Sequence, residues 1–441
     1  MHLKRRTLLT GALAGLVPGT VGRVSAASRR VFPEGFLWGA ATAAYQVEGN
    51  NTNSDTWALE HADPTTFTEV SGDAANSFQL WPRDLDLVAT LGLDTYRFSL
   101  EWARIEPARG QFSVAMLDHY KRIIEGCHAR DITPVVTFNH FTTPIWFAAN
   151  GGWSSPEAVD LFARFCEMAA RHLADGMAVA TTLNEPNLVG MLEVALPGGR
   201  GKQLMGPDKA MSEAVARRLG VDLFLAGNPI YVPDRHVVQA NLIAGHKAGR
   251  AAIKSVRGDL PVGVSLAIND DQAIAGGEPL RDSMRRELYD PWLETARDDD
   301  FLGVQNYYRA VWGPDGKVPI PDDAIVNSSG SEIYAASLAG AVRYAYSRCP
   351  RPVFVTEHGV ATDDDAQRAA FIPAALRALY GVMQEGIPLK GYLHWSLLDN
   401  YEWFHGYGPR YGLCDVDRTS FARTPKPSAH VLGALARANA V

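Results

Sequence analysis

Eight short, apolar, β-rich runs recur along this 441-residue chain, and helical patterns separate most of them. No linker rich in Pro, Gly and Ser divides the chain after residue 30. Alternating strands and helices of this kind predict a parallel sheet, and eight repeats favour one closed (β/α)8 TIM barrel over residues 31–441. The runs lie at residues 36–43, 95–100, 133–140, 177–184, 261–268, 301–308, 352–357 and 389–396.

The competing architecture is an open, doubly wound sheet. We would expect a glycine-rich phosphate loop after the first strand of such a fold. None follows the run at 36–43, and the glycines of segment 406–412 have the wrong spacing and follow no strand. The barrel therefore remains the favoured fold, and it predicts an active site at the C-terminal ends of its strands.

Two glutamates each close one of these runs, Glu185 in TTLNEPN and Glu357 in VFVTEHGV. Two carboxyl groups that face each other across a sugar are the minimum equipment for cleaving a glycosidic bond. A general acid needs a raised pKa, whereas a nucleophile must stay ionised beside a cation or hydrogen-bond donors. The arrangement predicts a glycosidase, although a carboxylate that only caps a helix would explain Glu185 alone equally well.

Residues near the other strand ends could support the nucleophile. Arg97, in TYRFSL, is a candidate cation for Glu357, and Tyr308 is a candidate hydroxyl donor. An ordinary ion pair inside a barrel is also a sufficient explanation of Arg97. His358 is interpreted as a supporting or exposed residue and not as a base.

The segment around the last strand, YLHWSLLDNYEWFHGYGPRYGL (392–413), carries the densest polar and aromatic pattern. Trp395 and Trp403 offer flat apolar faces suited to a pyranose ring, and Glu402 can accept hydrogen bonds from two hydroxyl groups. An aromatic-rich core strand would explain the leucines of this segment. It explains poorly why Glu402 stands between two tryptophans.

Five ordered segments make the chain resemble glycoside hydrolase family 1, the β-glucosidase type, over about residues 32–430. They are FLWGAATAAYQVEG, YRFSLEWARIEP, TLNEPN, VTEHGV and HWSLLDNYEWFHGYGPRYGL. The resemblance implies a retaining mechanism with Glu357 as nucleophile and Glu185 as acid and then base. It implies that the sugar is bound by Gln46, His140, Asn184, Trp395, Glu402 and Trp403, with Arg97, Asn306 and Tyr308 in support.

The same resemblance bears on the substrate and on what the reaction requires. Glu402 would repel a phosphate, which predicts an unphosphorylated β-glycoside or oligosaccharide, most simply a β-glucoside. No HExxH motif or His/Asp cluster is present, and two carboxylates suffice, so no metal and no cofactor are expected. A transglycosylase would share the covalent intermediate, and a non-catalytic sugar-binding protein on the same fold would be expected to lack one glutamate.

The sequence departs from the family pattern at four places. Thr-Glu-Asn-Gly becomes Thr-Glu-His-Gly at 356–359, and the usual His-Trp pair becomes His140-Phe141. The segment FLGVQNYY (301–308) has one extra residue between its glycine and its asparagine. The segment 188–235 does not follow the usual pattern, which leaves the sugar preference and the leaving group open.

Charge and cysteine content limit the partners. A formal net charge of −7 with no basic stripe argues against nucleic acid. The four cysteines show no CxxC spacing. Free buried thiols are the expectation for Cys127 and Cys166, although an exported location would permit a disulfide.

Residues 1–26 read as an export signal of the twin-arginine kind. Lys4, Arg5 and Arg6 precede an apolar stretch, and Val24-Ser25-Ala26 offers a cleavage site. The stretch is too short and too interrupted by Gly and Pro to span a bilayer well. We therefore expect a mature chain without a membrane span, in the periplasm or secreted.

Overall fold

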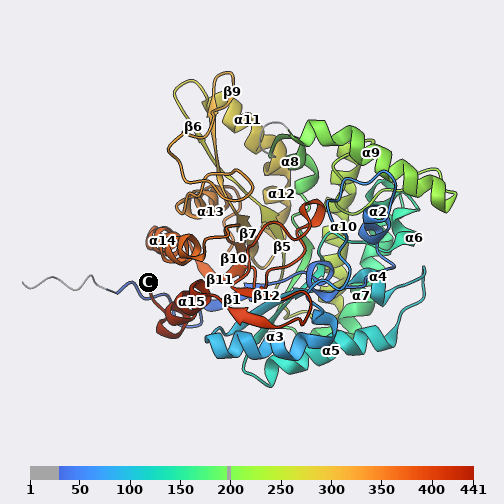
Figure 1. The fold of residues 1–441 in the computed structure, drawn as a ribbon, viewed down its shortest axis with the longest axis horizontal. Helices are drawn as coiled ribbons and strands as arrows, with labels where there is room; N and C mark the ends of the chain where they lie inside the picture. The colour runs from blue at the N-terminus through green and yellow to red at the C-terminus, as the bar shows by residue number, and fades with distance from the viewer. Residues whose placement is uncertain (1–28, 196–199) are drawn as a thin grey trace, which may run out of the picture.

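The protein folds around a closed barrel of parallel strands (Figure 1). The structure, a computed structural model, describes residues 29–195 and 200–441; the expected export signal, residues 1–26, lies outside the described residues. The order of neighbouring strands is β1-β11-β10-β7-β5-β4-β3-β2, with β2 pairing back to β1. The (β/α)8 prediction is confirmed. The barrel strands are β1 (Leu37–Ala41), β2 (Thr95–Ser99), β3 (Thr133–Asn139), β4 (Val179–Asn184), β5 (Val262–Ala267), β7 (Leu302–Asn306), β10 (Val353–His358) and β11 (Leu389–Trp395).

Helices that follow the strands cover the outside of the barrel (Figure 1). Side-chain caps begin several of them: Ser113 accepts a hydrogen bond from the backbone N–H of Met116 at the start of α5, and Asp234 and Asp364 cap α10 and α14. The principal outer helices are α3 (Ser77–Leu91), α5 (Val114–His128), α7 (Ala158–Leu173), α10 (Arg235–Val256), α12 (Asp290–Thr295), α13 (Ser337–Arg348), α14 (Asp365–Gln384) and α15 (Pro427–Ala438).

Further elements lie in the connections. The sequence did not predict the small sheet of β6 (Asp270–Ala273), β8 (Arg309–Gly313) and β9 (Gly316–Lys317), nor the hairpin of β12 (Cys414–Val416) and β13 (Arg423–Pro425). The small sheet and α11 project from the barrel at the top of Figure 1. The other helices are α1 (Ala44–Glu48), α2 (Asp55–Glu60), α4 (Trp102–Ile105), α6 (Ile145–Ala148), α8 (Leu188–Ala195), α9 (Arg200–Leu219) and α11 (Glu278–Leu288).

The barrel is filled by side chains, as a packed core requires. A buried cluster of apolar residues includes Ala41, Val135, Phe301, Phe354 and Trp395. The pairing register of β10 with both of its neighbours shifts between Val355 and His358. Such irregularities redirect side chains next to functional sites, and this one lies where Glu357 leaves the sheet.

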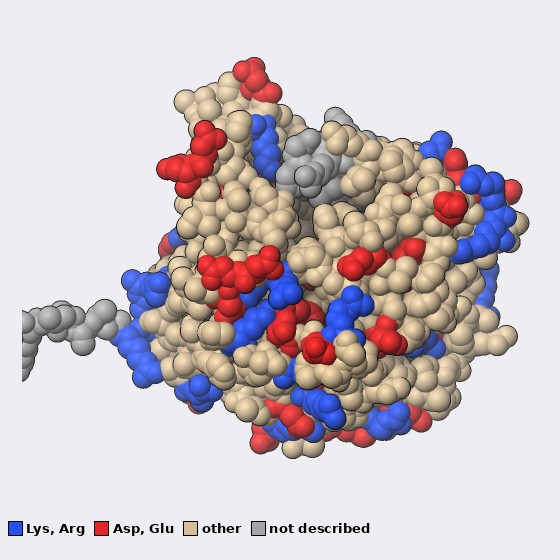
Figure 2. Space-filling model, viewed as in Figure 1, with Lys and Arg blue, Asp and Glu red and all other residues tan. Residues whose placement is uncertain are grey.

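Charged residues of both signs are mixed on the face of the protein drawn in Figure 2, and no basic stripe crosses that face. Within residues 29–195 and 200–441, no helix is long and apolar enough to cross a membrane. All four cysteines are buried and free, which agrees with the thiols expected at Cys127 and Cys166.

Candidate active site

Arg97 lies at the centre of the polar cluster at the barrel mouth. Its side chain is fully buried on β2, and the guanidinium makes a hydrogen bond or ion pair in each of three directions. Nη1 donates to Oε1 of Glu357 at 2.6 Å, and Nη2 donates to Oδ1 of Asn184 at 2.6 Å. Nε donates to the hydroxyl of Thr137 at 3.0 Å. One cation thus fixes side chains from three other strands, β3, β4 and β10.

Glu357 is held in a form suited to remain ionised. Its second carboxylate oxygen accepts a hydrogen bond from the hydroxyl of Tyr307 at 2.6 Å. Burial raises the pKa of Glu357, whereas Arg97 and Tyr307 oppose that rise because they stabilise the anion. The hydroxyl donor was expected to be Tyr308, and that assignment is wrong: the Tyr308 hydroxyl interacts with Asn269 instead.

Strand alternation explains the correction on β7. Successive side chains of a strand point to opposite faces, so Gln305 and Tyr307 share one face, and Asn306 and Tyr308 share the other. Gln305 pairs with Glu357 across the sheet, and its amide donates to Oδ1 of Asn184 at 2.8 Å. Asn306, also expected in the site, instead donates to the backbone oxygen of Ile268 and accepts from Ser337.

Glu185 differs from Glu357 in its surroundings. It follows β4 with a φ of 45°, a left-handed conformation that is uncommon for non-glycine residues. Burial raises the pKa of Glu185 well above its usual range, and the charge of Glu357 raises it further, while Arg97 opposes the shift. Arg97 and Tyr307 hydrogen-bond to Glu357, so of the two carboxyl groups Glu185 has the surroundings that more strongly favour the protonated form.

The side chains expected to bind the sugar gather around these carboxyl groups. Nδ2 of Asn184 lies 3.1 Å from Nε2 of His140, and the His140 ring stacks on Trp395 with centroids 5.6 Å apart. Burial lowers the pKa of His140 well below its usual range, so the imidazole is neutral. Its Nδ1 is buried without a protein partner, as is Oε1 of Gln46. Both atoms are free to pair with hydroxyl groups.

The loop after β11 supplies the remaining expected residues. The indole nitrogen of Trp395 donates to Glu402 at 3.4 Å. The ring of Trp403 stacks on Tyr45, with centroids 5.8 Å apart and an interplanar angle of 9°. The amide of Gln46 donates to Asn400 and to the backbone oxygen of Tyr401. Gln46, on α1, thus joins the segment after β1 to the loop after β11.

His358, which replaces the asparagine of the family motif, lies outside this cluster. It is fully buried, its Nδ1 lies 3.0 Å from the Tyr392 hydroxyl, and its ring stacks on Phe371 of α14. Burial lowers the pKa of His358 to about 3. A neutral imidazole between sheet and helix fits the expected supporting role. An exposed position, the other expectation, is wrong.

In the described part of the chain, no three His, Cys, Asp or Glu side chains are placed to hold a metal ion. The buried carboxylates of the site are instead paired with Arg97, Tyr307 and Trp395. We therefore assign no residues to a cofactor or metal. That neither is required stays a prediction.

Comparison with known proteins agrees with this geometry. The sequence model of glycosyl hydrolase family 1 matches residues 28–206 and 318–441, which include both glutamates. The chain belongs to this family. β-Glucosidase A of Thermotoga maritima is 30% identical over 90% of this chain and 96% of its own. The crystal structure of a β-glycosidase, 46% identical, has a TM-score of 0.87 over 93% of this chain and 98% of its own. The apo structure of a β-glucosidase, 42% identical, also has a TM-score of 0.87, over 91% of this chain and 98% of its own.

Family membership makes the protein a retaining O-glycosyl hydrolase of the β-glucosidase-like kind. The matched ranges leave residues 207–317 outside, a stretch that contains α10, β5, the small sheet, β7 and Tyr307, which directly follows β7. The unmatched stretch overlaps the segment 188–235, where the sequence departs from the family pattern, at residues 207–235. It also includes Asn306 and Tyr308.

The hydroxyl of Tyr307 should set the ionisation of Glu357. In Tyr307→Phe the carboxylate loses a donor that favours its charged form, so its pKa should rise. The acid limb of kcat/KM on a nitrophenyl β-glucoside should move to higher pH by about one unit. Tyr308→Phe is the matched control and should leave that limb in place. Equal shifts in the two variants would contradict the assignment.

Proposed function

We propose that the protein hydrolyses unphosphorylated β-glycosides, most simply β-glucosides, through a covalent glycosyl-enzyme on Glu357, with Glu185 as acid and then base. The observation that carries the proposal is the asymmetry between the two buried carboxyl groups. Arg97 and Tyr307 hydrogen-bond to Glu357, whereas no such bond to a cation or hydroxyl is recorded for Glu185 among the described residues. An ionised nucleophile beside a protonated acid is the starting state of a retaining mechanism.

In the first step, Glu357 attacks the anomeric carbon, and Glu185 gives its proton to the departing oxygen. The Glu357 charge is then lost to the covalent bond, which removes the repulsion that raised the pKa of Glu185. Glu185 can then accept a proton from the attacking water. Asn184, held by Arg97 and Gln305, and His140 are placed to bind sugar hydroxyl groups at the same subsite.

Replacing each glutamate should give a different kinetic defect. Glu357→Ala should lower kcat on a nitrophenyl β-glucoside by about four orders of magnitude or more, because no nucleophile remains. Added azide can occupy the space left by the side chain, so it should restore turnover and give an α-glycosyl azide. An unchanged rate in this variant would refute the nucleophile assignment.

Glu185→Ala serves as the comparison. Activated aryl leaving groups need little protonation, so their release should fall far less than that of alkyl leaving groups. A uniform loss over both classes of leaving group would contradict the acid role. Glu185→Ala should retain the thermal unfolding profile of the parent protein. Glu357→Ala leaves the buried Arg97 without its carboxylate and should lower Tm, so its kinetics are measured well below that Tm.

The substrate is proposed to be unphosphorylated because the half-buried Glu402 brings a carboxyl group to the sugar site, where it bonds to Trp395. A phosphate there would meet a carboxyl group instead of a cation. Hydrolysis of a nitrophenyl β-glucoside should therefore exceed hydrolysis of its 6-phosphate by at least about a hundredfold in kcat/KM. Preference for the 6-phosphate would refute the proposal.

Export is proposed from the sequence of residues 1–26, where Arg5 and Arg6 precede the apolar stretch. In a bacterial host with twin-arginine transport, the activity should appear outside the cytoplasm. Replacing Arg5 and Arg6 by lysine should retain the activity in the cytoplasm. Equal export of both forms would contradict a twin-arginine signal.

A further inference from the structure

The loop that carries Glu402 and Trp403 is closed at its base. We call residues 396–414 the β11 loop. A bridge joins Leu398 to Cys414, and the backbone N–H of Leu413 donates to the oxygen of Ser396 at 2.8 Å. A side chain on Gly412 would place its Cβ 2.0 Å from the backbone nitrogen of Asp399. The two ends of the loop therefore touch directly.

A largely buried ion pair between Asp399 and Lys426 holds this base together. Oδ1 of Asp399 accepts a hydrogen bond from the backbone N–H of Gly412 at 2.8 Å. Nζ of Lys426 donates to Oδ2 of Asp399 at 2.6 Å and to the backbone oxygen of Gly412 at 3.0 Å. Both side chains are only 13% exposed. Lys426 directly precedes α15, so the C-terminal segment takes part in holding the loop.

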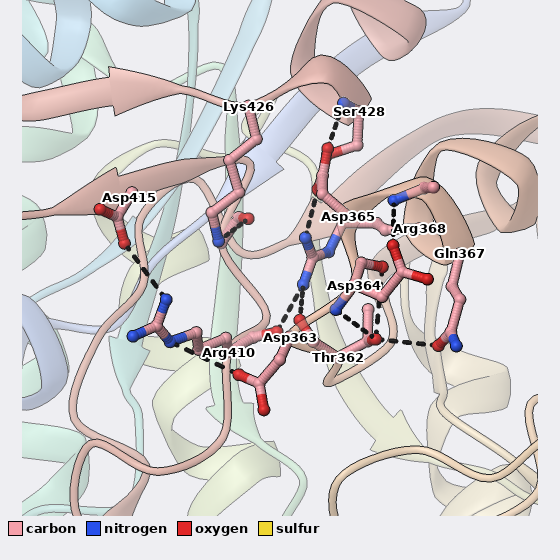
Figure 3. A network of polar contacts seen from close by, with 12 residues as sticks. Thr362, Asp363, Asp364, Asp365, Gln367, Arg368, Arg410, Asp415, Lys426 and Ser428 are labelled. Carbon is pink, nitrogen blue, oxygen red and sulfur yellow. Dashed lines mark hydrogen bonds and ion pairs between the residues drawn. The ribbon is translucent and has the colours of Figure 1, made fainter.

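A second buried cation lies beside this pair. Arg368 of α14 is fully buried and donates to the backbone oxygens of Arg410 and Thr362 (Figure 3). It also pairs with Asp365, which accepts hydrogen bonds from the N–H and hydroxyl of Ser428. The two outer helices α14 and α15 are thereby joined to the same end of the β11 loop.

Asp399 also acts on Glu402 through its charge. Burial raises the pKa of Glu402 to about 8; the Trp395 hydrogen bond opposes the rise, and the charges of Glu357 and Asp399 add to it. Gln46 of α1 and the hydroxyl group of Tyr411 also face Glu402. Lys426 and Arg368 are the cations that face Asp399.

We propose that Lys426 is a positioning residue of the sugar site: by pairing with Asp399 it holds the base of the β11 loop closed, so that Glu402 stays placed to accept sugar hydroxyl groups. The inference rests on the proposed sugar-binding role of Glu402. Without Lys426, a buried Asp399 has two options. It takes up a proton and weakens its bond to Gly412, or it stays charged and disfavours the ionised form of Glu402.

The test measures binding without turnover. A neutral, non-hydrolysed phenyl β-thioglucoside is used as a competitive inhibitor of the full-length enzyme, and its Ki is measured from about pH 5 to about pH 9. Lys426→Met should raise Ki at least about tenfold, and Lys426→Arg, which keeps the charge, should stay within about threefold of the parent. Arg343→Met removes an exposed ion pair with Glu385 and is the remote control.

The pH dependence of Ki separates an effect of Lys426 on Glu402 from a general loss of protein stability. Glu402 ionises in this range, so the pH at which Ki changes should move upward in Lys426→Met, where Asp399 loses its counter-charge. It should move downward in Asp399→Asn, where the negative charge is gone. In the double variant Asp399→Asn/Lys426→Met, the pH at which Ki changes should not move upward, because residue 399 no longer carries the negative charge that Lys426 compensates.

Two results would overturn the inference. One is a Ki whose value and pH dependence are unchanged in both Lys426→Met and Asp399→Asn, whatever happens to Tm. The other is an equal loss in Lys426→Met and Lys426→Arg. Glu402→Ala separates the role of Glu402 from that of Lys426. An unchanged Ki in Glu402→Ala refutes the proposed role of Glu402. A Ki that rises in Glu402→Ala but not in Lys426→Met refutes only the role of Lys426.

Discussion

The site depends on one buried cation. Arg97 has no exposure to solvent, and a charge in that position is tolerated only when it is paired and hydrogen-bonded. Its partners are Glu357, Asn184 and Thr137, which come from three different strands. The same contacts that make Arg97 acceptable inside the barrel therefore fix the positions of Glu357 and of Asn184, which directly precedes Glu185. The requirements of stability and of catalysis coincide at this guanidinium.

The barrel and the grouping of most of its site residues could be predicted from the sequence. The eight apolar runs predict the eight barrel strands to within two residues at each end, because a buried parallel strand is an apolar run bounded by turns. The two glutamates, Arg97 and the residues of the last strand are brought together because the C-terminal ends of parallel strands share one mouth. This prediction does not require knowing which strands are neighbours in the barrel.

What the sequence did not reveal has identifiable causes. The extra residue in FLGVQNYY makes the family motif a poor guide to which tyrosine contacts Glu357. Strand alternation indicates Tyr307, because its side chain lies on the same face as that of Gln305, which pairs with Glu357. The small sheet of β6, β8 and β9 consists of strands of two to five residues, too short for any period to show. The ion pair between Asp399 and Lys426 joins residues that are 27 positions apart in the sequence. No local sequence pattern indicates that these two residues meet.

The central claim is that Glu357 forms the covalent bond. The most direct test is to treat the protein with an activated 2-deoxy-2-fluoro-β-glucoside, which slows release of the glycosyl-enzyme, and to locate the label by mass spectrometry of peptides. The account predicts one fluoroglucosyl group per chain, attached to Glu357. A label on Glu185, or continued rapid turnover with no labelled peptide containing Glu357, would contradict it.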